Sequence, residues 1–330
     1  MPLRVVLVGA GTMGRIHAEA YRQIPEAALT AVVDPGPAGA ELAARHGVAA
    51  FRRLDDVVVA YDVLDVTVPT AWHPSLVVAG LADGRAVLCE KPIALTLDDA
   101  DRMLDAANRA GGRLGVGHVV RYFPEYVAAH DAVTGGDLGD VAVARMFRGG
   151  PFPRGWNDWY ADDQQSGGPF VDLVIHDFDF LLWTFGPAER VSARAVGGVA
   201  GRTPTVVSAV LRFRSGMVAQ VTGSWAHPRF GTRFELAGSK RLMSHDSLSA
   251  ATLVTDQTGS GESAGVAVPS APRHASPYVL ELADMMEGIA AGRPFRVTAE
   301  DARAALRLAL AARQAATSGC AVALDERDAR

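Results

Sequence analysis

Lysine is scarce in this chain of 330 residues. Of its 32 lysine and arginine residues, only Lys91 and Lys240 are lysine. Because arginine supplies nearly all the positive charge here, a retained lysine is a candidate for a position that needs a compact ammonium group. Lys91 lies in Glu90-Lys91-Pro92 and is the first catalytic candidate, with a surface salt bridge as the alternative. Lys240 lies in a sequence typical of a turn.

Other features that are rare or absent exclude whole classes of protein. The two cysteines, Cys89 and Cys320, are too few for a disulfide framework and lack the spacing of a metal site. The net charge of -5, with both signs interspersed, gives no basic stripe for nucleic acid. The apolar run from Val5 to Ala10 is too short for a signal peptide, and no stretch is long enough to span a membrane. We therefore expect a soluble cytoplasmic protein without a membrane or nucleic-acid partner.

The length of 330 residues exceeds what one hydrophobic core usually holds, so two domains are expected. Up to residue 120, short apolar strands alternate with helical patterns, which predicts a doubly wound parallel sheet. From residue 121 onward, longer strands alternate in polarity, for example Val141 to Arg148 and Val218 to Ser224. They predict an open, mainly antiparallel sheet. The expected α/β fold has domains over residues 1–120 and 121–330, and the final helix is a candidate to pack back on the first domain.

A glycine turn follows the first strand. The apolar run from Leu3 to Val8 leads into a Gly-x-Gly-x-x-Gly pattern and then into a helical pattern from Ile16 to Tyr21. In a dinucleotide-binding unit, the first glycine permits the turn, the second lets the backbone approach a pyrophosphate, and the third lets the helix pack on the strand. The cofactor-binding candidates in this turn are Gly9, Gly11, Thr12, Met13 and Gly14.

An acidic residue then stands where a dinucleotide site needs one. A second strand, Leu29 to Val33, ends at Asp34, about 20 residues beyond the turn, as expected for the acid that binds an adenosine ribose. A carboxylate accepts a hydrogen bond from the ribose 2'-hydroxyl and repels a 2'-phosphate. NAD is therefore favoured over NADP, although Arg45, Arg52 or Arg53 could fold back toward a phosphate.

Two further strands bring polar residues to the same edge of the sheet. The strand from Val63 to Val68 stops at a loop whose cofactor candidates are Pro69, Thr70 and His73, and His73 could instead cap the next helix. The strand from Ala86 to Cys89 delivers Glu90 and Lys91 to this edge. The next strand is expected from Leu114 to Val120.

Glycine and proline residues bracket a predicted helix from Phe170 to Phe185 that is apolar almost all round. Four polar residues interrupt it: Asp172, His176 and Asp179, which share one face, and Asp177. Since burying charges is costly, these side chains either satisfy one another or line a polar cleft, and Lys91 favours the cleft. No third ligand at a recognisable spacing accompanies them, so no metal is expected. No Gly-x-Ser-x-Gly elbow supports a hydrolase.

The loop before this helix combines aromatic and hydrogen-bonding side chains. This mixture suits a ring with several hydroxyls, and the alternative is a loop anchored by two core tryptophans. Its residues are Arg154, Trp156, Asn157, Asp158, Trp159 and Tyr160.

Two later segments carry no predicted chemistry. Thr255 to Ser276 is rich in glycine, serine and proline and is expected to form a long surface loop. Thr298 and Asp301 give a capping signal for a structural helix from Ala302 to Ala316.

Several motifs occur together. They are the glycine turn, Glu90-Lys91-Pro92, Gly117-His118 with Arg121-Tyr122, Gly136-Asp137-Leu138-Gly139, and Ser-Gly-Gly-Pro leading to Asp172 and His176. Over nearly the whole chain, this combination resembles the glucose-fructose oxidoreductase and inositol dehydrogenase family (Gfo/Idh/MocA). Two residues depart from the usual pattern of this family. Pro169 stands where a third glycine is usual, and Tyr122 stands where phenylalanine is common.

The resemblance implies a Rossmann domain followed by an α/β domain whose open sheet often forms an oligomer interface, and hence a homodimer or homotetramer. It implies Lys91, Asp172 and His176 as the catalytic set, Asp34 on the adenosine ribose and Glu90 near the nicotinamide. The substrate-binding candidates are Lys91, Arg121, Tyr122, Arg154, Asn157, Trp159, Tyr160, Asp172 and His176.

The residue types suit alcohol oxidation. An imidazole with a pKa of about 6.5 can accept the hydroxyl proton at neutral pH, so His176 is the expected base. Asp172 would orient it or the substrate, and the Lys91 ammonium would stabilise alkoxide charge. We expect an NAD-dependent dehydrogenase of a cyclitol or sugar, with inositol as the best single candidate. A glycosidase of this fold that uses NAD transiently, a dehydrogenase of another polyol and a non-enzymatic NAD-binding regulator stay open as alternatives.

Overall fold

The computed structural model describes residues 1–197, 205–249, 253–257, 266–268 and 276–324. These residues divide into two compact units. The first comprises the described residues of Met1–Tyr122, Gly155–Trp159 and Ala275–Arg303, and the second those of Phe123–Arg154, Tyr160–His274 and Ala304–Arg330. No helix in the described part of the chain is both long enough and apolar enough to cross a membrane.

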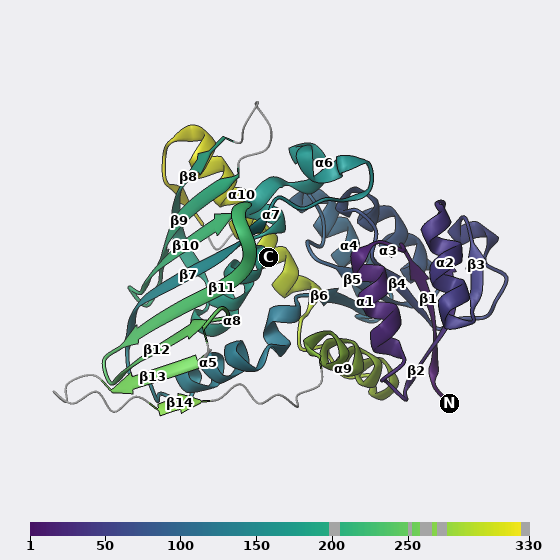
Figure 1. Ribbon diagram of the computed structural model, residues 1–330, viewed down its shortest axis with the longest axis horizontal. Coiled ribbons are helices and arrows are strands. Elements are labelled where there is room, and N and C mark those ends of the chain that lie inside the picture. The colour runs from purple at the N-terminus through teal and green to yellow at the C-terminus, as the bar shows by residue number, and fades with distance from the viewer. Residues whose placement is uncertain (198–204, 250–252, 258–265, 269–275, 325–330) are drawn as a thin grey trace. The chain divides into compact units, whose positions relative to one another are not determined.

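The first unit contains a six-stranded sheet in the order β3-β2-β1-β4-β5-β6, and every neighbouring pair is parallel (Figure 1). This is the strand order of a dinucleotide-binding fold, and it confirms the predicted doubly wound sheet. The strands are β1 (Leu3–Val8), β2 (Ala27–Val33), β3 (Ala49–Phe51), β4 (Val63–Val66), β5 (Ala86–Glu90) and β6 (Leu114–Gly117).

Helices pack on this sheet through apolar clusters. One cluster joins α1 to α9 and the strands beneath them, with Tyr21, Leu88 and Met286 among its buried members. Thus α9, which follows most of the second unit in sequence, completes the core of the first. The helices are α1 (Thr12–Tyr21), α2 (Pro37–His46), α3 (His73–Ala82), α4 (Leu97–Arg109) and α9 (Pro277–Ala291), with 3-10 turns η1 (Leu54–Asp56), η2 (Thr70–Trp72) and η3 (Val119–Tyr122).

The predicted C-terminal boundary of the strand from Leu114 to Val120 is wrong. The strand stops at Gly117 and gives way to the turn η3, where the His118 carbonyl accepts the Arg121 N–H at 3.2 Å. A Cβ on Gly117 would lie 3.2 Å from Oε1 of Glu90, so the glycine leaves room for that carboxylate at the end of the neighbouring strand.

The second unit is built on a nine-stranded sheet in the order β14-β13-β12-β11-β7-β10-β9-β8-β15. Within this second sheet, β7 and β10 form the only parallel pair among its described strands, which confirms the prediction of a large, mainly antiparallel sheet. The strands are β7 (Val141–Pro151), β8 (Ala188–Val196), β9 (Val206–Phe213), β10 (Val218–Ser224), β11 (Ala226–Gly238), β12 (Arg241–Asp246), β13 (Leu253–Gln257), β14 (Val266–Val268) and β15 (Val322–Ala323).

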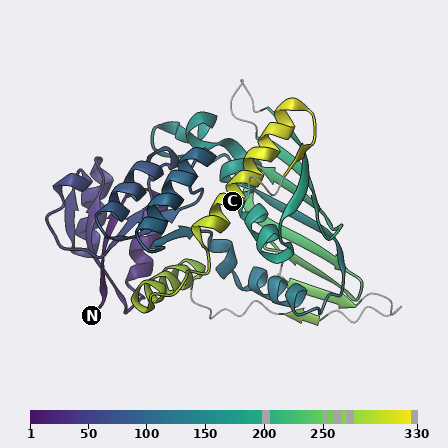
Figure 2. The ribbon, with the colours of Figure 1, turned by 180° about the vertical axis from the view of Figure 1, so that it is seen from behind.

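Helices of the second unit cover one face of this sheet. Figures 1 and 2 show α5, α8 and the latter part of α10 on the same side of the strands. Burial alternates along β9, as expected for a sheet with one covered and one open face. The second unit's helices are α5 (Pro124–Thr134), α6 (Asp163–Ser166), α7 (Gly168–Asp172), α8 (Ile175–Phe185) and most of α10 (Ala299–Ser318), and the 3-10 segment η4 spans Trp156–Ala161.

The single helix predicted from Phe170 to Phe185 is two helices. α7 ends at Asp172 and α8 begins at Ile175. At the break, the Pro169 carbonyl accepts the Val174 N–H at 2.9 Å, five residues away, and the Val174 carbonyl accepts the Asp177 N–H at 3.0 Å, three residues away. These departures from the four-residue spacing end one helical register and start another.

The predicted capping signal at the start of α10 is confirmed. The Thr298 hydroxyl accepts the Asp301 N–H at 3.1 Å, and the Asp301 carboxylate accepts the Thr298 N–H at 3.1 Å.

The prediction of a surface loop over Thr255 to Ser276 is wrong for the residues of this segment at which β13 pairs with β14. Residues 258–265 and 269–275 of that segment lie outside the described residues.

Candidate active site

The glycine turn connects β1 to α1 at the point where the strand order reverses, between β1 and β4. Gly9 has φ +102°, and a Cβ there would lie 2.8 Å from the Thr67 carbonyl oxygen. Gly11 is the N-cap of α1 and no side chain caps the helix. The first N–H groups of α1 therefore lack a side-chain partner from the cap, which suits an anion at this end of the helix.

Gly14 and Gly11 differ in the space available beside their Cα atoms. A Cβ on Gly14 would lie 2.0 Å from the carbonyl oxygen of Gly9, so Gly14 is required for close packing of the helix against the turn. A Cβ on Gly11 would meet nothing within 4 Å. Open space thus lies beside the backbone at the N-terminus of α1, and this arrangement fits a dinucleotide pyrophosphate. Thr12 and Met13 form the first turn of the same helix.

The Asp34 carboxylate is fixed at the end of β2 by two backbone amides. It accepts the Ala10 N–H at 2.9 Å and the Gly36 N–H at 2.7 Å. Because each carboxylate oxygen has two lone pairs, both oxygens keep capacity to accept a further hydrogen bond. The structure therefore holds an oriented acceptor next to the glycine turn, where an adenosine ribose would need one.

The loop after β4 places Thr70 in η2 and His73 as the first residue of α3, both buried. Nδ1 of His73 lies 3.0 Å from the Pro92 carbonyl and Nε2 lies 2.9 Å from the Val68 carbonyl. Burial lowers the pKa of His73, which favours the neutral ring. Because a neutral imidazole has one N–H, the ring donates to only one of these two carbonyls. A cofactor role for Pro69, Thr70 and His73 stays a prediction.

Glu90 and Lys91 are joined at the end of β5. Oε2 of the buried Glu90 carboxylate accepts the backbone N–H of Lys91 at 3.0 Å, and Oε1 lies 3.2 Å from Nε2 of His17. Burial alone would raise the pKa of Glu90, but the hydrogen bond and charge of His17 lower it. Glu90 is therefore a carboxylate that contacts both the peptide N–H of Lys91 and the ring of His17.

Arg121 and Tyr122 make contacts within the first unit. The buried Arg121 donates to Asp301 at 3.1 Å, and the Tyr122 hydroxyl donates to Asp284 at 2.7 Å. Burial and the neighbouring Asp284 raise the pKa of Tyr122 well above its usual range. These contacts tie η3 to α9 and to the start of α10, and the predicted substrate roles of both residues stay predictions.

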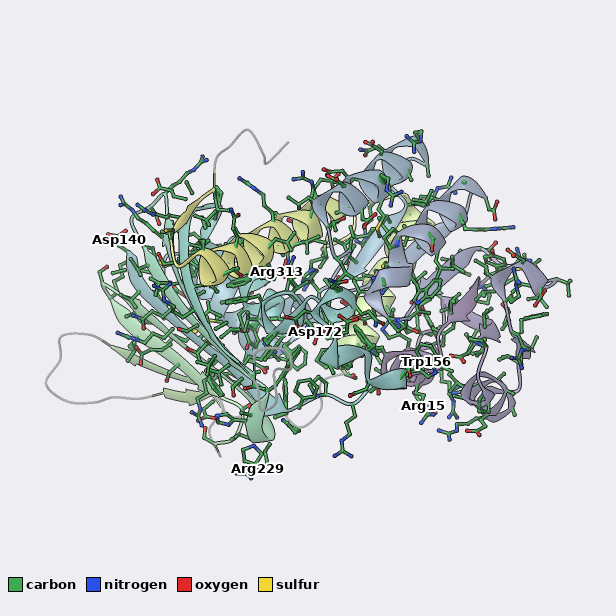
Figure 3. The ribbon with its side chains drawn as sticks, turned by 90° about the horizontal axis from the view of Figure 1, so that it is seen from above. Arg15, Asp140, Trp156, Asp172, Arg229 and Arg313 are labelled. Atoms are coloured by element: carbon green, nitrogen blue, oxygen red, sulfur yellow. The ribbon has the colours of Figure 1, made fainter. Side chains whose placement is uncertain are left out.

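In the second unit, Asp172 and His176 flank the break between α7 and α8. Asp172 is the last residue of α7 and His176 lies in the first turn of α8, and both side chains are half-buried (Asp172 is labelled in Figure 3). The structure thus keeps these two predicted catalytic residues on consecutive helices of one unit. Lys91 belongs to the other unit.

A buried ion pair fixes α8 next to His176. Asp177 accepts from Nε of Arg148 at 2.8 Å and from its Nη2 at 3.1 Å. Nη2 also donates to the Tyr126 hydroxyl at 3.3 Å. Despite burial, Asp177 raises the pKa of Arg148, and burial raises that of Tyr126 to about 12. A charged bidentate pair therefore anchors α8 to β7.

The loop before α6 carries unusual backbone geometry. Asn157 and Asp158 have φ values of 53° and 51°, a left-handed region that these two residue types tolerate better than most. Trp156 is 73% exposed (Figure 3) and Trp159 is half-buried, so the alternative of a loop anchored by two core tryptophans is wrong. The substrate roles of Arg154, Asn157, Trp159 and Tyr160 stay predictions.

Sequence reasoning missed several buried polar residues. His17 shares the buried face of α1 with Gly14 and Tyr21, and Asp65 interrupts an apolar strand, so a polar residue at a buried position was the available signal. Arg148 gave a similar signal within β7, whereas its partner Asp177 was noted among the polar residues of the predicted helix.

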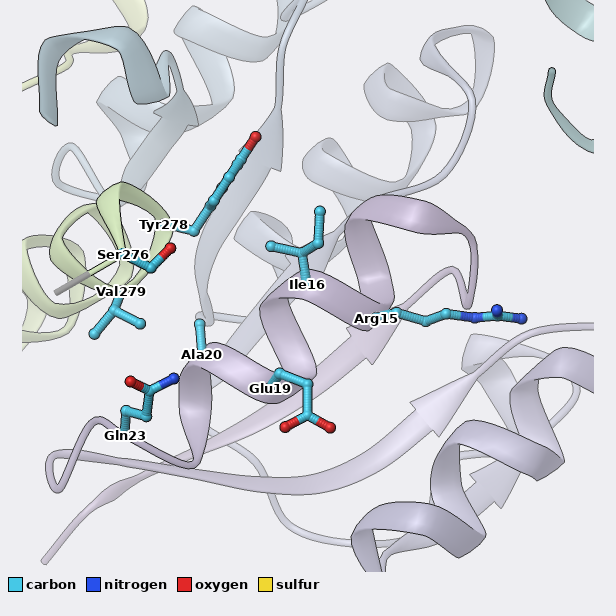
Figure 4. A pocket seen from close by; sticks show the side chains of 8 residues that line it. All are labelled: Arg15, Ile16, Glu19, Ala20, Gln23, Ser276, Tyr278 and Val279. Atoms are coloured by element: carbon cyan, nitrogen blue, oxygen red, sulfur yellow. The ribbon is translucent and has the colours of Figure 1, made fainter. Parts of the chain in front are cut away.

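A cavity of about 340 Å³ lies along the side of α1 that faces α9 (Figure 4). It contains none of the residues predicted to bind cofactor or substrate, and Arg15 points away from the α9 side chains in this view. The lining residues are Arg15, Ile16, Glu19, Ala20, Gln23, Ser276, Tyr278 and Val279.

Comparisons with known proteins match both units. The Gfo/Idh/MocA model described as an oxidoreductase family with an NAD-binding Rossmann fold matches residues 3–118, and the GFO/IDH/MocA C-terminal domain matches residues 126–244. Myo-inositol 2-dehydrogenase of Thermotoga maritima is 31% identical over 98% of this chain and 99% of its own length. Inositol 2-dehydrogenase of Rhizobium meliloti is 30% identical over 94% of this chain and 96% of its own.

Solved structures agree with these matches. GenD2 from gentamicin A biosynthesis, solved in complex with NAD, is 28% identical and superposes with a TM-score of 0.87, covering 98% of this chain and 97% of its own. The glycine turn and the oriented Asp34 carboxylate described above are where such a fold binds its dinucleotide. The chain therefore belongs to the Gfo/Idh/MocA family and is an NAD-binding oxidoreductase with a Rossmann domain.

Proposed function

We propose that this protein is an NAD-dependent dehydrogenase that oxidises a secondary hydroxyl of a cyclitol or sugar, with an inositol as the best single candidate. The observation that carries this proposal is the full-length similarity to two inositol 2-dehydrogenases, in a chain that has Lys91, Asp172 and His176 in its motifs.

Lys91, Asp172 and His176 would each have a separate role at the reacting hydroxyl. When bound, NAD supplies the nicotinamide ring that accepts the hydride from the substrate carbon. His176 accepts the hydroxyl proton on a ring nitrogen, and Asp172 orients the imidazole or the substrate. The Lys91 ammonium donates a hydrogen bond to the oxygen as negative charge develops there. In the reverse direction, His176 returns the proton to a ketone oxygen.

Asp34 supports NAD as the preferred dinucleotide. Its carboxylate is held by the amides of Ala10 and Gly36, so it could not turn away from a 2'-phosphate without losing both hydrogen bonds. We expect Asp34→Ala to weaken NAD binding by about 1.5–3 kcal/mol, the usual value of a hydrogen bond to a charged group, and to weaken NADP binding less or not at all. Titration of both dinucleotides against the two proteins measures this difference.

The direct test is NADH absorbance with a panel of inositols, aldoses, sugar acids and polyols, each with NAD or NADP. We expect turnover with one cyclitol or sugar, and a loss of about 10²–10⁴-fold in kcat for Lys91→Ala and His176→Asn. Lys240→Ala is the matched control, because it removes the only other lysine, whose ammonium binds the Gly136 carbonyl at the surface.

The outcomes separate the alternatives. NAD binding without turnover of any substrate contradicts the dehydrogenase and supports a regulator. Release of a glycoside's leaving group without accumulation of NADH supports a glycosidase. Full activity of Lys91→Ala would contradict the role given to Lys91.

A further inference from the structure

Four polar side chains meet beneath the turn that carries Lys91, all in the first unit. His17 and Tyr21 come from α1, Asp65 from β4 and Glu90 from β5, and each is at least nine-tenths buried. Nδ1 of His17 lies 2.9 Å from Asp65 and Nε2 lies 3.2 Å from Glu90. The Tyr21 hydroxyl donates to the same Asp65 oxygen at 2.7 Å.

The geometry fixes the charge of His17. Both ring nitrogens face carboxylate oxygens, and a neutral imidazole has only one N–H, so both contacts are hydrogen bonds only when the ring is an imidazolium. Burial opposes that charge, but Asp65 and Glu90 outweigh it and raise the pKa of His17 well above its usual value. One imidazolium between two carboxylates leaves the buried cluster with one net negative charge next to Lys91.

This cluster connects the dinucleotide helix to the candidate catalytic lysine. His17 stands three residues after Gly14, on the helix whose packing against the turn depends on that glycine. Its Nε2 reaches one oxygen of Glu90, and the other oxygen of Glu90 accepts the peptide N–H of Lys91. A continuous path of hydrogen bonds thus runs from α1 to the Lys91 backbone.

Nothing else in these contacts holds Oε1 of Glu90. The Lys91 amide occupies Oε2, and Gly117 on β6 approaches the carboxylate without offering a side-chain donor. Tyr21, in contrast, binds Asp65 and does not contact Glu90. Removing His17 therefore frees Oε1 of Glu90, which leaves the carboxylate held only through Oε2 in these contacts, whereas removing the Tyr21 hydroxyl leaves both of its contacts in place.

We propose that His17, as an imidazolium, is a positioning residue that holds Glu90 against the Lys91 peptide and so fixes Lys91 relative to the glycine turn. The proposal rests on the proposed function in one respect, namely that Lys91 acts on the substrate. The position of the peptide itself does not depend on any activity.

The test measures hydrogen exchange of the Lys91 amide in the full chain without substrate. His17→Leu removes both ring donors without replacing them and should speed this exchange by about 10-fold relative to amides of β1, because Oε1 of Glu90 loses its hydrogen bond. Tyr21→Phe is the matched control, since it removes a donor from the same buried cluster and should leave the Lys91 amide unchanged. Unchanged exchange in His17→Leu would overturn the proposal.

Ring nitrogen NMR of the wild-type protein gives a second measurement that needs no disruptive variant. The His17 signal should be that of an imidazolium at pH 7, and Glu90→Gln should shift it toward the neutral ring. The titration also depends on the groups around it, which are Asp65, Glu90, Tyr21, Cys89 on β5 and Glu281 on α9. A neutral His17 at pH 7 would overturn the proposal even if His17→Leu failed to fold.

Kinetics distinguish this proposal from the proposed function. If the protein is a dehydrogenase, His17→Leu should lower kcat by about 10–100-fold with little change in the KM for NAD, as expected when a supporting residue shifts a reacting group. A fall in NAD affinity with unchanged kcat would contradict positioning of Lys91. If no substrate turns over at all, the proposed function fails, while exchange and NMR still decide the role of His17.

Discussion

Gly11 and Gly14 stand three residues apart, yet a methyl group added to each meets different surroundings. Gly14→Ala places a Cβ 2.0 Å from the Gly9 carbonyl oxygen, so we expect a loss of stability of about 1–3 kcal/mol or more. Gly11→Ala meets no protein atom within 4 Å, so we expect a nearly unchanged Tm but weaker NAD binding, because the methyl group occupies the space that fits the pyrophosphate. Thermal unfolding and NAD titration of both variants check this.

The two glycine variants serve as controls for each other. Equal loss of NAD affinity and of stability in both would contradict the distinction. Full NAD affinity in Gly11→Ala would show that the dinucleotide does not approach this position.

His17 predicts a specific dependence of stability on pH. Its pKa is raised in the folded protein, so its contribution is complete below the unfolded value of about 6.5 and is lost as the pH rises through the folded pKa. We expect the free energy of unfolding in urea to fall at alkaline pH, and His17→Gln to remove much of that fall. The lowered pKa of Glu90 acts in the other direction, since its contribution is lost as the pH drops through its folded pKa. An alkaline dependence unaltered by His17→Gln would contradict this assignment.

Among the elements, α8 carries His176 and is anchored by the Arg148–Asp177 pair. Arg148→Ala leaves Asp177 as a buried charge without this partner, so we expect a loss of about 3–5 kcal/mol in stability. The double variant Arg148→Met with Asp177→Leu should recover much of the loss, because it removes both charges. Urea unfolding measures each variant.

Strand β7, which carries Arg148, also provides a matched control. Arg145 also lies on β7, but its pair with Glu235 is exposed to solvent. We expect Arg145→Ala to cost less than about 1 kcal/mol. Similar losses for Arg145→Ala and Arg148→Ala would show that burial of the pair is not what matters.

The helix boundaries show what the periodicity of apolar residues can and cannot predict. The helical pattern from Ile16 to Tyr21 predicted the C-terminal end of α1 at Tyr21, because this pattern depends on residues close together in the chain. The break at Leu173 and Val174 was not predictable in this way, since both residues are apolar and suit either a continuous helix or a change of register. At the break, α7 packs on β9 and β10, and a Cβ on Gly223 of β10 would lie 2.4 Å from a methyl carbon of Val174, so this change of register lies at a contact with distant strands.

For the whole molecule, the uncovered face of the nine-stranded sheet is the expected oligomer interface. Ser208, Val210 and Arg212 alternate outward along β9, and Val210 is 44% exposed. We predict a homodimer or homotetramer in solution and a shift toward monomer for Val210→Glu, because a charge replaces an apolar contact. Sedimentation analysis measures the mass of each.

Val58 supplies the control for that experiment. It is an exposed valine of the first unit, and Val58→Glu should leave the mass unchanged. A monomeric wild-type protein would contradict the predicted interface.

The sequence by itself determined the parts of this protein whose interactions are local. The glycine turn, the acid at the end of the second strand, the strand and helix alternation and the cap at Thr298 each depend on residues close together in the chain. Only the tertiary structure decided the pairing of His17 with Asp65 and Glu90, which lie 48 and 73 residues further along. Such contacts depend on which strands become neighbours and on which side chains they bury together, and no local pattern contains that information.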